Sequence, residues 1–185
     1  TGDMSNVVGY GAVAFSEGAG GGDPLGPQER ETLLGIARAS VEAAVRGDSA
    51  PPVPEVPPAL ARKQAAFVTL RADGEPRGCV GAIFAVRGLA EQVRESALAA
   101  SGDRRFPRLR AEELTQLEYE ITLLSPLVPL QDPETVVVGR DGLMLVQGDH
   151  RGVLLPSVPV EHGWDRERFL EEVGVKAGLG RRAWR

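Results

Sequence analysis

The sequence predicts an α+β protein with a largely antiparallel β-sheet and about three helices. Apolar residues recur at three- and four-residue steps over 28–46 and 88–100, which indicates two amphipathic helices. We expect a third helix over about 166–173, because Asp165 is a suitable N-cap residue. Short apolar or alternating runs predict strands over 65–71, 77–84, 117–124, 135–138, 143–147 and 152–156.

The beginning of the chain differs in composition from the rest. Residues 6–15 are predicted to form one extended segment with apolar side chains on both faces. Residues 16–27 are rich in glycine and predict a flexible linker, so that the folded unit begins near Pro27. Proline suits the first turn of a helix and glycine commonly ends one, so Pro27 and Gly47 delimit the first helix.

The central strands carry the clearest patterns. Asp73 and Gly74 predict a tight hairpin turn that makes 65–71 and 77–84 antiparallel partners. Residues 117–124 alternate, so that one set of side chains faces a core and the other set faces away. The first set is Leu117, Tyr119, Ile121 and Leu123, and the second is Glu118, Glu120 and Thr122.

The residue counts exclude several classes of protein. With 21 basic and 26 acidic residues, the net charge of −5 argues against a nucleic-acid binder, and 104–110 is the one local basic candidate. No run reaches the roughly 20 apolar residues of a membrane span, so we expect a cytoplasmic protein. One cysteine and two histidines exclude a disulfide within the chain, and we expect no metal or other cofactor.

The single cysteine, Cys79, lies in the segment Arg77-Gly78-Cys79-Val80-Gly81. In a regular strand, residues 77, 79 and 81 face the same side. A guanidinium from Arg77 would then favour the thiolate, while Gly81 would leave the other side of the sulfur open. The alternative is a buried structural cysteine between glycines that allow tight packing.

Other polar groups allow two interpretations each. Glu118 and Glu120 could form an acid–base pair, or they could be a solvated strand face. The segment Asp103-Arg104-Arg105 could bind an anion, or it could be a surface ion-pair cluster. His150 and His162 are single histidines in turn-like sequences, and neither predicts a metal site.

Several ordered motifs resemble the AMME candidate-gene family, known in prokaryotes as AmmeMemoRadiSam system protein A. Arg77 to Gly81 is similar to the family signature Arg-Gly-Cys-Ile-Gly, and Asp103 to Phe106 matches its Asp-x-Arg-Phe segment. The resemblance covers about 28–185, and its further motifs are 117–126, 139–143, 152–156, 164–165 and 176–179.

This resemblance implies an α+β fold with two subdomains. It also implies a pathway shared with a Memo protein and a radical-SAM protein. Cys79 would lie in a cleft, with Arg77, Arg105 and Glu120 as its partners. Further binding candidates in the matching motifs are Gly78, Gly81, Asp103 and Lys176. Gly174 departs from the family, which commonly has a second cysteine there, and this puts any role that needs two thiols in doubt.

Residues 1–15 resemble the C-terminal end of the Memo family, so we expect a fragment of a Memo and protein A fusion. Two hypotheses follow. The chain could be a component of a radical-SAM-linked modification system in which Cys79 is a nucleophile, a carrier or a substrate-binding thiol. Alternatively, it could be a non-catalytic docking module for the radical-SAM partner and the Memo domain, with Arg77 to Gly81 as a packing motif. The sequence does not decide whether the chain is an enzyme.

Overall fold

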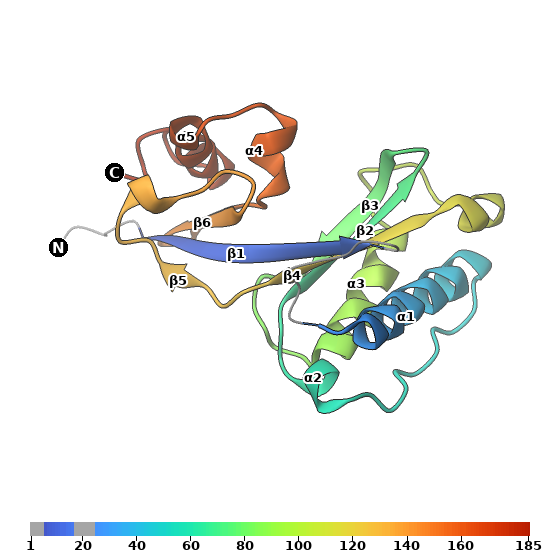
Figure 1. Ribbon diagram of the computed structural model, residues 1–185. Helices are drawn as coiled ribbons and strands as arrows, with labels where there is room; N and C mark the ends of the chain where they lie inside the picture. The colour runs from blue at the N-terminus through green and yellow to red at the C-terminus, as the bar shows by residue number, and fades with distance from the viewer. Residues whose placement is uncertain (1–5, 17–24) are drawn as a thin grey trace. The chain divides into compact units, whose positions relative to one another are not determined.

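The computed structural model describes residues 6–16 by their backbone and residues 25–185 in full (Figure 1). The chain divides into two compact units, which agrees with the two subdomains that the resemblance implied. We call the unit that lies between residues 13 and 124 the cysteine unit, because it contains Cys79. The other unit joins the residues before 13 to 125–185, and we call it the C-terminal unit.

The cysteine unit is a three-stranded antiparallel sheet with helices on one face (Figure 1). The strand order is β3 (Glu75–Gly81), β2 (Ala66–Ala72), β4 (Glu118–Leu124). The long helices α1 (Pro27–Arg46) and α3 (Leu89–Ser101) pack against each other and against these strands. The short helices of this unit are α2 (Pro58–Ala61) and the 3-10 helix η1 (Ala111–Gln116).

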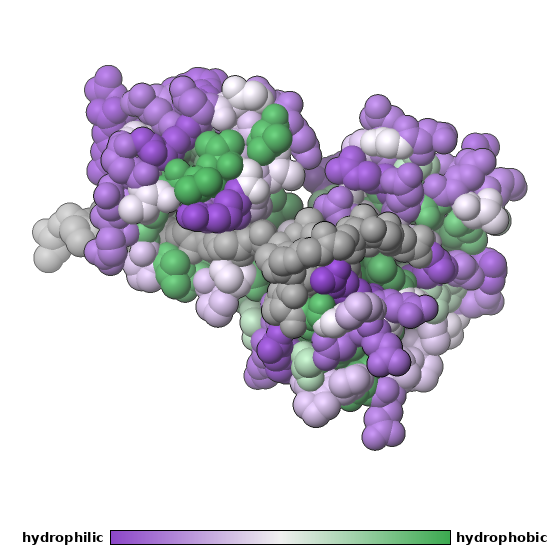
Figure 2. All heavy atoms as spheres, in the orientation of Figure 1, coloured by the Kyte–Doolittle hydropathy of each residue, from purple (hydrophilic) through white to green (hydrophobic). Residues whose placement is uncertain are grey.

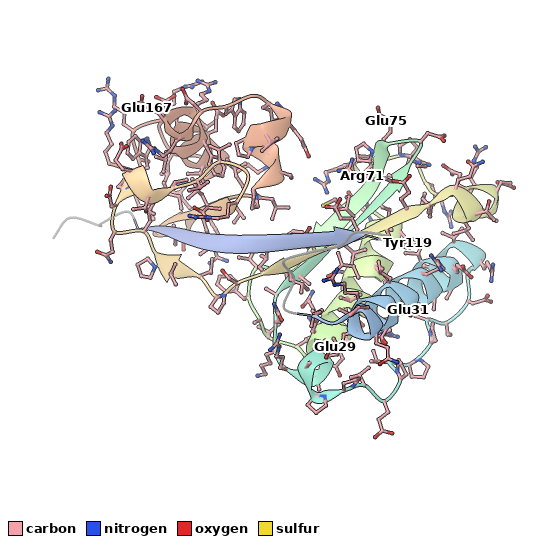
Figure 3. The ribbon with its side chains drawn as sticks, in the orientation of Figure 1. Glu29, Glu31, Arg71, Glu75, Tyr119 and Glu167 are labelled. Carbon is pink, nitrogen blue, oxygen red and sulfur yellow. The ribbon has the colours of Figure 1, made fainter. Side chains whose placement is uncertain are left out.

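The core of this unit lies between the sheet and the two long helices. Its largest fully buried side chain is Tyr119, which shares the apolar face of the sheet with Leu70, its partner in β2. Figure 3 shows Tyr119 beside α1, where the Arg38 guanidinium lies 5.6 Å from the centre of its ring. The remaining core residues of the strands and long helices include Leu33, Ala37, Val41, Val68, Leu70, Val93, Ala97, Ala100 and Ile121.

The local signals at the helix and hairpin ends are confirmed. Pro27 is the first residue of α1, and Gly47 ends the helix in the left-handed conformation with a φ of 81°. Asp73 and Gly74 both have positive φ angles, of 52° and 79°, as a two-residue hairpin turn of type I′ requires.

The C-terminal unit contains four of the described strands and has its own core. β1 (Asn6–Ser16) pairs with β5 (Val128–Pro129) and with β6 (Asp141–Gln147), and β6 pairs with β7 (His150–Leu154). The helices are η2 (Pro133–Thr135), α4 (Ser157–Glu161) and α5 (Arg166–Lys176). Phe169, Leu170 and Val173 of α5 pack on Leu143 and Leu145 of β6 in a second hydrophobic core.

The α+β class and the antiparallel pairing are confirmed, and three of the five α-helices in the described residues are the predicted long ones. The strand predicted over 135–138 is wrong. The Asp132 side chain accepts from Glu134 N and starts a 3-10 turn that occupies 133–135, while Val136 is buried in the second core. The strand predicted over 152–156 lies two residues earlier, because α4 begins directly after Pro156.

The domain boundaries predicted near the start of the chain stay predictions. Residues 1–5, and residues 17–24 of the expected linker, lie outside the described residues. In Figure 2 the C-terminal unit carries hydrophobic areas among hydrophilic ones. Its exposed large apolar side chains are Val128, Val137, Val160 and Val175. Within the described residues, no helix has the length and apolar character needed to cross a membrane.

Candidate functional site

On the polar face of the β3–β2–β4 sheet, Cys79 lies in line with Thr69 and Glu120. Thr69 of β2 pairs with Cys79 on one side and with Glu120 of β4 on the other. Directly paired residues of an antiparallel sheet project to the same face, so Cys79, Thr69 and Glu120 form one row. We call this the cysteine row.

The sulfur of Cys79 is hydrogen bonded within this row. Thr69 Oγ1 donates to Cys79 Sγ at 3.3 Å. Thr69 is 8 % exposed, whereas Cys79 is half-buried and is accessible in part. A hydroxyl that donates to sulfur stabilises negative charge on it, as a nucleophilic thiol requires.

The backbone of Cys79 is held by the segment that follows α3. Cys79 N donates to Asp103 Oδ2 at 3.1 Å, and a terminal nitrogen of Arg105 donates to Cys79 O at 2.5 Å. The Arg105 guanidinium also donates twice to the carboxylate of Asp103, at 2.6 and 3.0 Å. Asp103 and Arg105 therefore clamp both backbone polar groups of Cys79 through one ion pair.

This clamp sets the charge state of Asp103. Hydrogen bonds from Arg105 lower the pKa of the Asp103 carboxyl to about 2, against an opposing effect of burial, with further help from the backbone N–H groups of Cys79 and Arg105. The bond to Asp103 in turn raises the pKa of Arg105. Both groups are therefore charged throughout the physiological pH range.

Arg77 lies elsewhere than the sequence led us to expect. A β-bulge separates the pair Arg71–Pro76 from the pair Leu70–Gly78, so Arg77 is the extra residue of β3. Its guanidinium donates to Glu113 Oε1 of η1 at 2.5 and 3.1 Å. The regular alternation of 77, 79 and 81 therefore fails, and the guanidinium bonded to Cys79 belongs to Arg105.

The two glycines of the motif serve close packing on opposite faces. A Cβ atom on Gly78 would overlap the carbonyl oxygen of Ala100, so Gly78 lets α3 approach the sheet. A Cβ on Gly81 would overlap Phe67, whose ring occupies the side that we expected Gly81 to leave open. Both glycines are thus explained by contacts inside the cysteine unit.

Glu118 and Glu120 share their face with an arginine. Arg71, labelled in Figure 3, pairs with Glu118 across the strands, and its Nε lies 3.9 Å from Glu120 Oε2. This ion pair favours the interpretation of a charged, partly solvated face. Glu120 lies two strands away from Cys79, with Thr69 between them, so it would reach the sulfur through Thr69 or through a bound molecule.

The remaining predicted residues belong to the C-terminal unit. Lys176 is exposed in the last turn of α5, and Gly178 follows in the left-handed conformation, so this matching motif is a helix end. A Cβ on Gly174 would lie 2.7 Å from Gly180 O, which leaves no room there for a cysteine. His150 Nδ1 lies 3.2 Å from Ala177 O, and the His162 ring stacks on Trp164.

Thr69, Glu113 and Phe67 were missed from the sequence. Next to the turn, Ala72 is paired with Glu75. If the hairpin continued regularly from this pair, Thr69 would lie opposite Gly78. The bulge shifts the register by one residue and puts Thr69 opposite Cys79. Pro76 and Gly78 flank the bulge, and both residue types are common at bulges, but they do not determine the register that the bulge produces.

Among the described residues, no group of three His, Cys, Asp or Glu side chains is arranged to hold a metal ion. The site is therefore defined by a thiol on a polar sheet face, with its backbone clamped by an Asp–Arg pair, in an α+β protein of two units.

Comparison with known proteins identifies the family. The AMMECR1 family model matches residues 34–185, and the chain belongs to this family. A protein of Methanothermobacter thermautotrophicus is 40 % identical over 164 residues, which covers 84 % of this chain and 85 % of that protein. Protein PH0010 of Pyrococcus horikoshii is 39 % identical over 166 residues, covering 83 % of this chain and 81 % of that one.

The fold is also that of a solved relative. The crystal structure of the uncharacterized protein PH0010 from Pyrococcus horikoshii superposes with a TM-score of 0.78 and 35 % identity. The match covers 86 % of this chain and 85 % of that chain.

Proposed function

We propose that Cys79 is a reacting or substrate-binding thiol, and that the protein works in the cytoplasm as one component of a modification system. The hydrogen bond from Thr69 Oγ1 to Cys79 Sγ carries this proposal. It directs a donor at the sulfur on the polar face, while the clamp from Asp103 and Arg105 holds the backbone still. A positioned, partly accessible sulfur that accepts a hydrogen bond is suited to nucleophilic attack or to holding a substrate.

The partners in this proposal are a radical-SAM protein and a Memo-like domain fused to the front of this domain. The resemblance of residues 1–15 to the end of the Memo family supports the fusion, and the family resemblance supports the shared pathway. The sequence of the parent gene tests the fusion. An upstream reading frame that encodes no Memo-like domain would contradict it.

Alkylation of the thiol tests the role of Cys79 directly. Cys79 is the single cysteine of the chain, so every alkylation event reports this residue. We expect iodoacetamide at pH 7 to modify native Cys79 faster than a cysteine in an unstructured peptide. Thr69→Val should slow the reaction about threefold to tenfold, the equivalent of one hydrogen bond. Thr69→Ser keeps the hydroxyl and should retain most of the rate.

Two results would contradict this proposal. One is a native Cys79 that reacts no faster than the peptide in both the parent and the Thr69→Ser protein. The other is full rescue of a deletion strain by Cys79→Ala.

A docking module for the same partners is the second candidate, and the close packing of the motif favours it. Gly78 admits α3 and Gly81 admits the ring of Phe67, so the motif has a structural use without any chemistry at Cys79. In this case Cys79→Ala would keep pathway activity and would still co-purify with the radical-SAM partner. Loss of activity with retained co-purification would favour the thiol chemistry instead.

A further inference from the structure

A pocket of about 700 Å³ opens in the cysteine unit where α1 and α3 end. Its lining comes from the last turn of α1 and from the segment between Ser101 and Leu109. Val45, Phe106 and Leu109 give it an apolar part. This volume lies within the range of about 300–1,000 Å³ that is typical of small-molecule sites. Cys79 does not line the pocket, so it is distinct from the cysteine row.

Two guanidinium groups supply the charge of this pocket. Arg104 and Arg108 both line it, and neither side chain makes a hydrogen bond or ion pair with another residue that the structure describes. Asp103 also lines the pocket, but its carboxylate is occupied by Arg105 and by the backbone N–H groups of Cys79 and Arg105. Asp103 therefore leaves the charges of Arg104 and Arg108 uncompensated.

Backbone donors pair some of the carbonyl groups at the ends of the two helices. The last carbonyl groups of a helix carry partial negative charge when they are unpaired. Ala43 O and Ala44 O of α1 accept from Asp48 N and Gly47 N, and Ala99 O and Ala100 O of α3 accept from Gly102 N and Asp103 N. These four carbonyl groups are paired with backbone donors, which reduces the negative partial charge at the two helix ends.

We propose that this pocket binds a small organic anion. A phosphate or carboxylate group would accept hydrogen bonds from Arg104 and Arg108, whose planar guanidinium groups match both anions. The apolar body of the ligand would lie against Val45, Phe106 and Leu109. The ring of Phe106 is oriented by Arg105, whose guanidinium carbon lies 5.5 Å from the ring centre.

The pocket shares one residue, Asp103, with the clamp on the backbone of Cys79. Asp103 lines the pocket and also accepts the hydrogen bond from Cys79 N. Binding of an anion next to Asp103 would therefore alter the hydrogen bond between Asp103 and Cys79 N. The proposal of a binding site stands whether or not Cys79 reacts, because none of the lining groups depends on the thiol.

Amide chemical shifts of the full chain test the site with phenyl phosphate and benzoate as probes. We expect saturable shifts at the backbone amides of 44–45, 101–106 and 108–109 with at least one of the two anions, and weaker binding of uncharged benzyl alcohol. The double variant Arg104→Gln/Arg108→Gln should raise the dissociation constant at least tenfold. The ratio of the phenyl phosphate and benzoate constants then shows which anionic group the pocket prefers.

Two further variants separate a pocket from a charged surface. Arg87→Gln removes one exposed arginine outside the pocket and should leave the dissociation constant unchanged. Ala44→Phe fills the pocket without changing its charge and should abolish the shifts. The proposal is overturned if neither anion gives saturable shifts, if benzyl alcohol binds as tightly as both anions, or if Ala44→Phe leaves binding intact.

Discussion

The two faces of the β3–β2–β4 sheet are built from the same strands and serve different ends. On the face toward α1 and α3, Val68, Leu70 and Ile121 have no exposed surface. On the opposite face, Cys79, Glu120 and Arg71 remain partly exposed. The segment from Gly78 to Gly81 alternates between the two faces, so a single motif joins the core to the candidate site. Its residues therefore cannot be assigned one common role.

The largest effect should come from the covered face at Gly78. A methyl group there would overlap the carbonyl oxygen of Ala100, and neither backbone can yield without moving α3. We expect Gly78→Ala to lower the free energy of unfolding by about 3 kcal/mol or more, measured by urea denaturation with circular dichroism. Gly35→Ala is the control: nothing lies within 4 Å of the added methyl, so it should stabilise α1 slightly. Equal stability of Gly78→Ala and the parent protein would contradict the close approach.

A comparison of adjacent residues in β2 separates the two faces directly. Leu70 is fully buried in the core, whereas Arg71 points to the polar face. Leu70→Ala should cost about 3 kcal/mol through the lost burial and the cavity that remains. Arg71→Ala should cost less than about 1 kcal/mol, because its ion pair with Glu120 is partly solvated. Similar losses in the two variants would show that the faces do not differ as described.

The clamp on Cys79 predicts a pH-dependent contribution of smaller size. The pKa of Asp103 is about 2 in the folded protein and 3.8 in the absence of its partners. A depressed carboxyl pKa adds stability that is present above pH 4 and is lost as the pH falls through 2. We expect this contribution to the free energy of unfolding to be about 1 kcal/mol, because Arg105 is exposed and solvent weakens its ion pair with Asp103. The parent protein should have a higher free energy of unfolding than Asp103→Asn above pH 4, and this difference should disappear as the pH falls from 4 to 2. A difference that stays constant with pH would contradict the linkage.

The smallest effect should come from Glu120. Its ion pair with Arg71 spans 3.9 Å on a partly solvated face, so Glu120→Gln should change the unfolding free energy by less than about 0.5 kcal/mol. If Glu120 takes part in chemistry, the same variant should reduce pathway activity in a deletion strain without a change in stability. Unchanged activity would leave Glu120 as a surface residue only.

The sequence predicted elements whose signals are local. Pro27, Gly47 and the Asp73-Gly74 turn each determine backbone conformation within a few residues, and all three are where they were expected. The strand over 135–138 failed because Asp132 and Pro133 start a 3-10 turn before it. Here a local cap overrides the preference of a short valine-rich run for a strand.

The candidate site could be predicted only in part. The alternation of 117–124 correctly placed Glu118 and Glu120 on one face, because β4 is regular. The surroundings of Cys79 depend on a bulge at Arg77 and on a loop 24 residues further along the chain. Both result from tertiary packing. The sequence therefore identified Cys79, Asp103 and Arg105 as candidates, but it wrongly placed the Arg77 guanidinium beside the sulfur.

The bonds from Asp103 and Arg105 to the backbone of Cys79 also bear on solubility. β3 ends the strand order on its side of the sheet, and a free strand edge presents N–H and C=O groups that can template pairing with another chain. At Cys79 both outward groups are already satisfied by one carboxylate and one guanidinium, which act in place of a neighbouring strand. The segment after α3 thus covers the free edge of β3 at Cys79 and disfavours edge-to-edge association there.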